Sequence, residues 1–293
     1  MKFDIAAIDR RIIYLLVFMA LAVPLAWGYR VTPARLVGAE KLYAAVESVE
    51  RKAGSIALVA MDFGPSLVAE NGAQTEVVLE HLFRRRIPTV VFSLVDQAEP
   101  FLRAIPERIA ARLEAEYPGE RWTYGVDWVN IGYRVGGFLF IQGLPKATDL
   151  MATLGKDVRG NAVSDLPIAQ GVKGFESVAL LGQFSGLVGL FDIYIQFFQT
   201  KEHRPVFTHG CTSITIPEAF IYLDSGQLTG LLEGIAGAAW YSELLQRAYP
   251  ARVPDRSAAI NTGLGVAHLI IIAFILLGNV GVVMGRFGRR RRV

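Results

Sequence analysis

Hydrophobic residues form one long, uncharged segment near each end of the chain. Residues 12–29 carry no charged side chain, and residues 257–285 carry no Asp, Glu, Lys or Arg. A helix needs roughly 20 apolar residues to cross a hydrocarbon layer about 30 Å thick. Both segments are therefore predicted to be transmembrane helices, with the first near the lower limit of length.

A cleaved signal peptide is the alternative interpretation of the first segment. The small residues Ala20 and Ala22 could mark a cleavage site, but Val23 and Pro24 follow them and give it a poor context. We favour a retained anchor.

Between the two segments, short apolar runs alternate with stretches of helical periodicity. Apolar runs of four to seven residues separated by amphipathic helices are typical of strands that are buried on both faces of a parallel sheet. We expect an α/β domain over residues 30–256, with an open, mostly parallel five-stranded sheet and helices on both faces. The predicted strands cover 55–61, 88–94, 128–133, 177–182 and 205–208, and the predicted helices cover 33–52, 66–86, 101–117, 144–154, 187–200, 217–223 and 228–249.

Positive charge is concentrated at the two chain ends. The chain has 30 basic and 27 acidic residues, a net charge of +3. Without the eight basic and two acidic residues of the ends, 22 basic and 25 acidic residues remain, so the rest carries −3. The basic balance is therefore no argument for nucleic-acid binding.

The positive-inside rule makes both ends cytoplasmic. Residues 1–11 and 286–293 then lie in the cytoplasm of a bacterium, and the central domain lies outside its inner membrane. The Arg-rich tail, Arg286 and Arg289 to Arg292, serves as a topology signal or as a contact for anionic lipids. Both interpretations stay open, with the first favoured.

Polar residues follow each predicted strand, and they define the candidate binding site. Ligands of open parallel sheets bind beyond the carboxyl ends of the strands. The same residue types also form ordinary turns and helix caps, so each match is weak alone. The candidate ligand-binding residues are Asp62, Ser66, Ser93, Tyr133, Gln183, Ser185, Gly186 and Thr212.

His209 and Cys211 form the most reactive pair of residue types among these strand ends. Side chains at i and i+2 of a strand share a face, so the pair could act as base and nucleophile, with Asp62 and Ser185 nearby. Cys211 is the only cysteine, which excludes an internal disulfide, and we favour a buried structural role for it. No His/Cys spacing indicates zinc, and no cofactor is identified. His268 and Asn279 are polar residues of the second span with an open role.

Three segments resemble those of an uncharacterised family of bacterial membrane-anchored α/β proteins. They are Gly125–Tyr133, Gly210–Thr212 and Tyr222–Ala239. The resemblance implies the architecture. It implies no catalytic residue, because the family has no known activity.

These observations favour a non-enzymatic component of a membrane complex. Its extracytoplasmic domain would bind a ligand or a protein partner at the carboxyl edge of the sheet, and the partners would be other membrane-protein subunits or a second copy. One alternative is an anchored hydrolase or transferase that uses Asp62, Ser185, His209 and Cys211. Another is a structural scaffold whose crevice is filled and inert.

Overall fold

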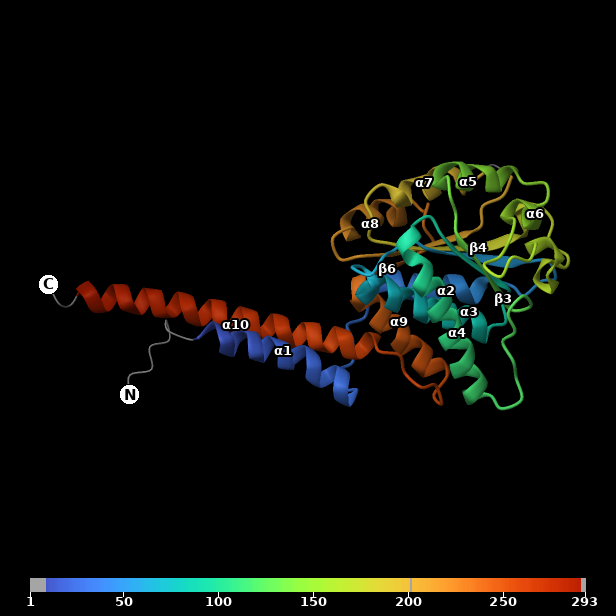
Figure 1. Ribbon diagram of the computed structural model, residues 1–293. Coiled ribbons are helices and arrows are strands. Elements are labelled where there is room, and N and C mark those ends of the chain that lie inside the picture. The colour runs from blue at the N-terminus through green and yellow to red at the C-terminus, as the bar shows by residue number, and fades with distance from the viewer. Residues whose placement is uncertain (1–8, 201, 291–293) are drawn as a thin grey trace. The chain divides into compact units, whose positions relative to one another are not determined.

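The computed structural model describes residues 9–200 and 202–290, with side chains described up to residue 281. The chain divides into an α/β domain, residues 34–257, and a terminal unit formed by residues 9–33 and 258–290. Figure 1 shows both units.

The α/β domain is built on one sheet in which every strand pair is parallel. The α/β class and the helices on both faces are confirmed, but the predicted number of five strands is wrong, because the sheet has six. The strand order is β3-β2-β1-β4-β5-β6. The strands are β1 (Ile56–Met61), β2 (Thr89–Ser93), β3 (Trp128–Tyr133), β4 (Val178–Ser185), β5 (Val206–Cys211) and β6 (Gly230–Glu233).

The sixth strand lies inside the segment that was predicted as a helix over 228–249. Residues Gly230–Glu233 pair with β5, and only then does α9 (Gly234–Ala248) begin. A Cβ atom on Gly230 would lie 2.3 Å from the Cα of Leu42, and Gly234 has a φ of +56°. The two glycines therefore permit a close helix–strand contact and a sharp turn into α9.

Two helical layers cover the sheet (Figure 1). One layer contains α2 (Val37–Ser48), the π-helical turn Val68–Gly72, α3 (Ala73–Arg84), α4 (Glu99–Glu116) and α9. The other contains α5 (Gly137–Gly143), α6 (Leu150–Leu154), α7 (Leu190–Phe197) and α8 (Ile216–Asp224). The predicted helix 144–154 is wrong as one element. Its first residues, Leu144–Lys146, form a 3-10 turn that is separate from α6. Asp149 caps α6 by accepting a hydrogen bond from the Ala152 N–H.

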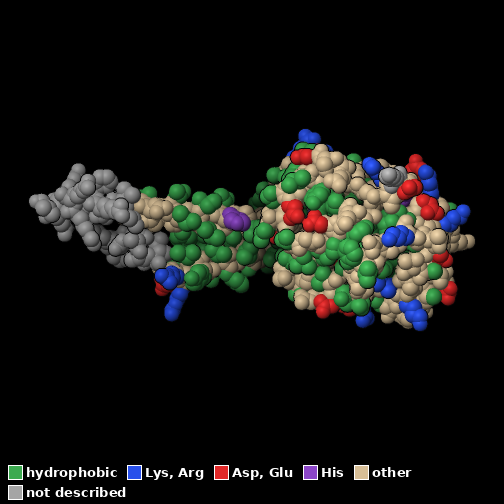
Figure 2. Space-filling model, turned by 90° about the horizontal axis from the view of Figure 1, so that it is seen from above, with side chains coloured by type: hydrophobic (Ala, Val, Ile, Leu, Met, Phe, Trp, Pro, Cys, Tyr) green, Lys and Arg blue, Asp and Glu red, His purple; other side chains and the backbone are tan. Residues whose placement is uncertain are grey.

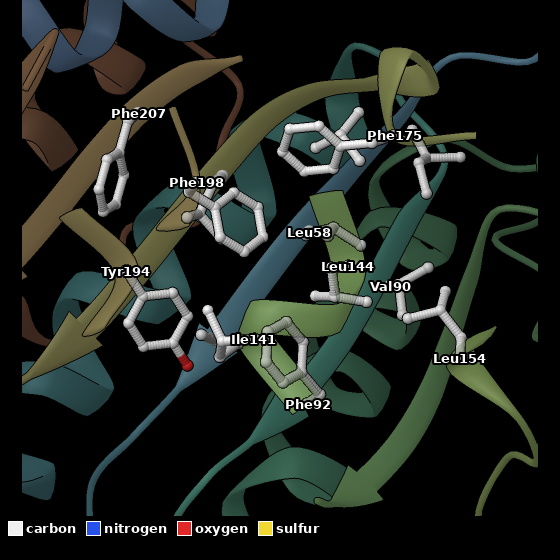
Figure 3. Close-up of a cluster of buried hydrophobic side chains, with 14 of the residues drawn as sticks. Leu58, Val90, Phe92, Ile141, Leu144, Leu154, Phe175, Tyr194, Phe198 and Phe207 are labelled. Carbon is white, nitrogen blue, oxygen red and sulfur yellow. The ribbon is translucent and has the colours of Figure 1, made fainter. Parts of the chain in front are cut away.

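A hydrophobic core lies between the sheet and the layer of α5 to α8. Figure 3 shows side chains of β1 and β2, such as Leu58 and Phe92, facing Ile141 of α5 and Tyr194 of α7. All six residues of β1 are fully buried. Burial on both faces explains why this strand is a continuous apolar run in the sequence.

The terminal unit contains two helices that are long and apolar enough to cross a membrane. They are α1 (Arg10–Trp27) and the portion Ser257–Gly281 of α10 (Ser257–Arg290). At Gly263 the helices approach closely, because a Cβ atom there would lie 3.2 Å from the carbonyl oxygen of Ala20. The Val31 N–H also donates to Thr262 Oγ1 at 2.9 Å.

His268 and Asn279 of the second span have exposed side chains. His268 Nδ1 pairs at 2.8 Å with the Leu264 carbonyl of its own helix, and Asn279 is exposed. Residues 1–8 and 291–293, and the side chains of 282–290, lie outside the described part of the chain. The cytoplasmic placement of both ends therefore stays a prediction.

We expect Gly230→Ala to destabilise the α/β domain by about 1–3 kcal/mol, because the added Cβ collides with the backbone of α2 at Leu42. Chemical unfolding of the full chain in detergent measures this loss. Gly143→Ala is the matched control, since nothing lies within 4 Å of its added Cβ. Equal stability of the two variants would contradict the close contact.

Candidate functional site

Asp62 is the polar centre of the carboxyl edge of the sheet. Its fully buried carboxylate follows β1 and accepts four hydrogen bonds. Oδ1 accepts from the Leu94 N–H at 2.7 Å and from Ser93 Oγ at 3.2 Å. Oδ2 accepts from Tyr194 OH at 2.7 Å and from Gln183 Nε2 at 3.1 Å. The carboxylate thus joins the ends of β1, β2 and β4 to α7, and in Figure 3 the Tyr194 hydroxyl points toward the β1 ribbon.

Burial raises the pKa of Asp62 above its ordinary value of 3.8, although its four donors act in the opposite direction. A carboxylate with four protein donors has little capacity left for a ligand. Its geometry is therefore that of a structural group that closes the edge.

His209 lies two strands from β1, on β5. Its Nδ1 is 3.0 Å from the carbonyl oxygen of Gln183, and its ring stacks on Phe191 at a centroid distance of 4.1 Å. Because a carbonyl oxygen only accepts, Nδ1 carries the proton and Nε2 is the unprotonated nitrogen. Burial lowers the pKa of His209 to about 3, so the ring is neutral at physiological pH.

Cys211 and His209 share a strand face, as predicted, but the structure does not pair them. The Cys211 thiol donates to the carbonyl oxygen of Leu232 at 3.6 Å and is fully buried. Burial raises its pKa to about 12. A thiol with such a pKa is almost entirely protonated at neutral pH and is a poor nucleophile.

The other predicted residues divide into buried and exposed groups. Ser93, Ser185 and Thr212 are buried. Ser185 Oγ accepts from the Leu187 N–H at 3.0 Å, which is an ordinary turn interaction. A Cβ atom on Gly186 would lie 2.3 Å from the side chain of Thr212, so these two loops are in close contact.

Ser66 and Tyr133 have exposed side chains and lie outside the Asp62 cluster.

The predicted ends of β4 and β5 were three residues too early. Gln183, Ser185, His209 and Cys211 are therefore paired strand residues, with Gln183 opposite His209 and Ser185 opposite Cys211.

A second polar cluster, on the opposite face of the sheet, was missed from the sequence. Gln74 Nε2 lies within 2.7–3.1 Å of the carbonyl oxygens of Cys211, Leu232 and Gly234. Asn71 Nδ2 donates to Gln74 Oε1 at 2.9 Å and to the Gly210 carbonyl at 3.1 Å. This cluster ties the ends of β5 and β6 to α3. A glutamine inside a helical pattern gives no sequence signal for such a role.

The carboxyl edge carries exposed polar side chains, such as Ser66, Asp96 and Ser213, and also exposed apolar ones. The apolar ones follow β3, β4 and β5, and we call them the apolar rim. Phe138, which follows β3, packs its ring edge-on against Phe197 of α7, the helix that follows β4, at a centroid distance of 5.0 Å. In Figure 2 hydrophobic side chains are visible over the α/β domain among charged ones. The apolar rim consists of Val135, Phe138, Leu139, Leu187, Val188 and Ile214.

A cavity of about 320 Å³ lies elsewhere, beside the outer strand β3. Its lining includes Glu99 and Arg103 of α4, Trp128 of β3, and Tyr124 and Arg159 from flanking loops. None of the predicted site residues lines it. Among the described residues, no group of three or more His, Cys, Asp or Glu side chains is placed to hold a metal ion.

The fold and the site together define an α/β protein with an all-parallel six-stranded sheet and two candidate membrane helices. Comparison of the chain with known protein families, curated proteins and solved structures finds no match. The resemblance to an uncharacterised membrane-anchored family therefore stays a prediction.

We expect Asp62→Ala to cost about 3 kcal/mol or more of unfolding free energy, because it leaves buried donors unpaired. Asp62→Asn should cost less. Gln183 Oε1 is buried without a partner among the described residues, so a flipped Gln183 amide can accept from the amide that this substitution introduces.

The same pair of variants gives a pH test. A pKa raised in the folded state means that stability is lost as pH rises above the ordinary value of 3.8. The advantage of wild type over Asp62→Asn should therefore shrink as pH rises from about 4 in urea unfolding of the detergent-solubilised chain. An advantage that grows with pH would contradict the raised pKa.

Cys211 should resist thiol reagents while the domain is folded. A pKa of about 12 instead of 9.0 lowers the thiolate fraction near neutral pH by about a thousandfold, and burial limits access further. Mass spectrometry after iodoacetamide treatment measures the rate, with urea-unfolded protein as the control. Labelling as fast in the folded chain as in the unfolded one would show that the thiol is accessible and ionised.

Proposed function

We propose that this protein is a non-enzymatic, double-anchored subunit of a bacterial membrane complex. Its extracytoplasmic α/β domain acts by binding at the carboxyl edge of its sheet. The observation that carries the proposal is the contrast at this edge between buried, mutually bonded polar groups and an exposed apolar rim.

The chemistry of the edge supports binding over catalysis. Asp62 is occupied by four protein donors, and the Cys211 thiol is bonded to a backbone carbonyl. A nucleophile needs a base within hydrogen-bond reach, and among the described residues no hydrogen bond joins the His209 ring to the Cys211 thiol. The hydrolase or transferase alternative would require this core to rearrange.

The apolar rim supports a binding surface. Val188 is 78% exposed and Ile214 is 87% exposed, and both lie in loops at the ends of adjacent strands. Exposed apolar side chains that gather at one edge are typical of interaction sites. The two candidate spans at the chain ends give the reason to expect the binding event at a membrane.

Purification of the full chain from native membranes in mild detergent tests this proposal. Everything that co-purifies is identified, including protein, lipid and small molecules. We expect a specific component that is retained by wild type and is reduced several-fold by the double variant Val188→Asp and Ile214→Asp.

Val126→Asp is the matched control, because Val126 is an exposed valine just before β3, at the opposite edge of the sheet. It should retain the component, and so should Cys211→Ser if that variant stays folded. If the rim variant and wild type bind the same components equally, the edge is not the binding surface. If His209→Gln abolishes a measured turnover while the domain stays folded, the enzyme alternative is correct.

A further inference from the structure

We infer that the occupant of the apolar rim is the lipid bilayer itself, so that the α/β domain lies with the carboxyl edge of its sheet against the membrane surface. This inference rests on the proposed function, because it names what the carboxyl edge binds. Three features of the α/β domain support it: the positions of its two chain ends, the way those ends are fixed, and the composition of the rim.

The chain enters the domain at the carboxyl edge. Helix α2 begins at Val37, and a Cβ atom on Gly38 would lie 2.4 Å from Oε1 of Glu233, the last residue of β6. One turn later, Leu42 lies against Gly230 at the start of β6. The helix therefore starts at the carboxyl edge and runs toward the amino edge, and only Ala34 to Leu36 precede it in the domain.

The chain leaves the domain near the same edge. Ser257 Oγ lies 3.5 Å from the carbonyl oxygen of Ala238, early in α9, and α9 begins directly after β6. The candidate span begins at Ser257 itself. Both connections to the candidate spans thus depart from the edge that carries the rim.

A buried ion network fixes the departing segment. Arg252 is buried and donates to Glu80 of α3 at 2.6 and 2.7 Å, and also to Asp255 at 2.5 Å. Asp255 Oδ1 in turn accepts from the Ser257 N–H at 2.7 Å. The exit point is therefore part of the folded domain, and anchoring presents one particular edge of the domain to the bilayer.

The rim has the composition of a surface that inserts into the interface of a bilayer. The stretches 185–191 and 210–217, which carry Leu187, Val188 and Ile214, contain no charged residue. Glu70 and Glu218 flank the second loop, so the attraction is hydrophobic and does not depend on anionic lipids. Tethering by two spans makes even a weak contact persistent, because binding is intramolecular.

Reconstitution in vesicles of zwitterionic phosphatidylcholine tests the inference. Single cysteines at Val188→Cys, Ile214→Cys and Val126→Cys are labelled with an environment-sensitive fluorophore, and lipid-borne nitroxides are added as quenchers. The buried Cys211 gives the background, which is measured on labelled wild type. We expect quenching at 188 and 214 to be several-fold stronger than at 126, and to be unchanged by salt or anionic lipid.

A second variant separates insertion from mere proximity. Adding Val188→Asp and Ile214→Asp to Leu139→Cys should reduce quenching at 139 to the level seen at 126, while circular dichroism stays unchanged. Equal quenching at 188 and 126 would overturn the bilayer as occupant. A blue shift at 188 without lipid quenching would instead identify a second copy of the chain, and co-purification of a protein through the rim would overturn the inference while keeping the proposed function.

Discussion

The buried carboxylate of Asp62 is the interaction on which the carboxyl edge depends. It gathers donors from β2, β4 and α7 onto the end of the central strand, and so closes the position at which parallel sheets usually receive a ligand. A carboxylate without these donors would be prohibitively costly at full burial. Each of its partners is therefore committed to the fold, and the edge is ordered before any ligand arrives.

This commitment explains why the polar residues of the edge carry no evident chemistry. The Asp62 cluster and the Gln74 cluster lie on opposite faces, and together they tie five of the six strand ends to helices. His209 and Cys211 complete the inner surface, bonded to the carbonyl oxygens of Gln183 and Leu232. With these polar groups turned inward and paired, the loops after β3, β4 and β5 expose the apolar side chains of the rim.

The sequence predicted the elements whose pattern is set by burial, and it failed where tertiary context decides. Continuous apolar runs located β1, β2 and β3 within one residue at each end. The last residues of β4 and β5 were missed because they include the polar residues Gln183 and His209. The burial of these two side chains depends on partners far away in the chain. The strand β6 is only four residues long, and its two leucines fit a helix as well as a strand. Asp62 was found as a strand-end acid, but Tyr194 and Gln74 lie within helices and carry no signal of their polar contacts.

Both chain ends of the domain reach one edge because of two additions to the alternating strand–helix pattern. Strand β1 must begin at the amino edge, so a chain that enters at the carboxyl edge needs a helix to cross the domain first, and α2 makes that crossing along β6. Helix α9 runs from the carboxyl edge toward the amino edge, and the segment held by Arg252 brings the chain back to Ser257. A domain tethered at only one end would need only one of these devices. The presence of both, one on each side of the strand–helix repeats, brings the two chain ends of the α/β domain to the closed edge of its own sheet.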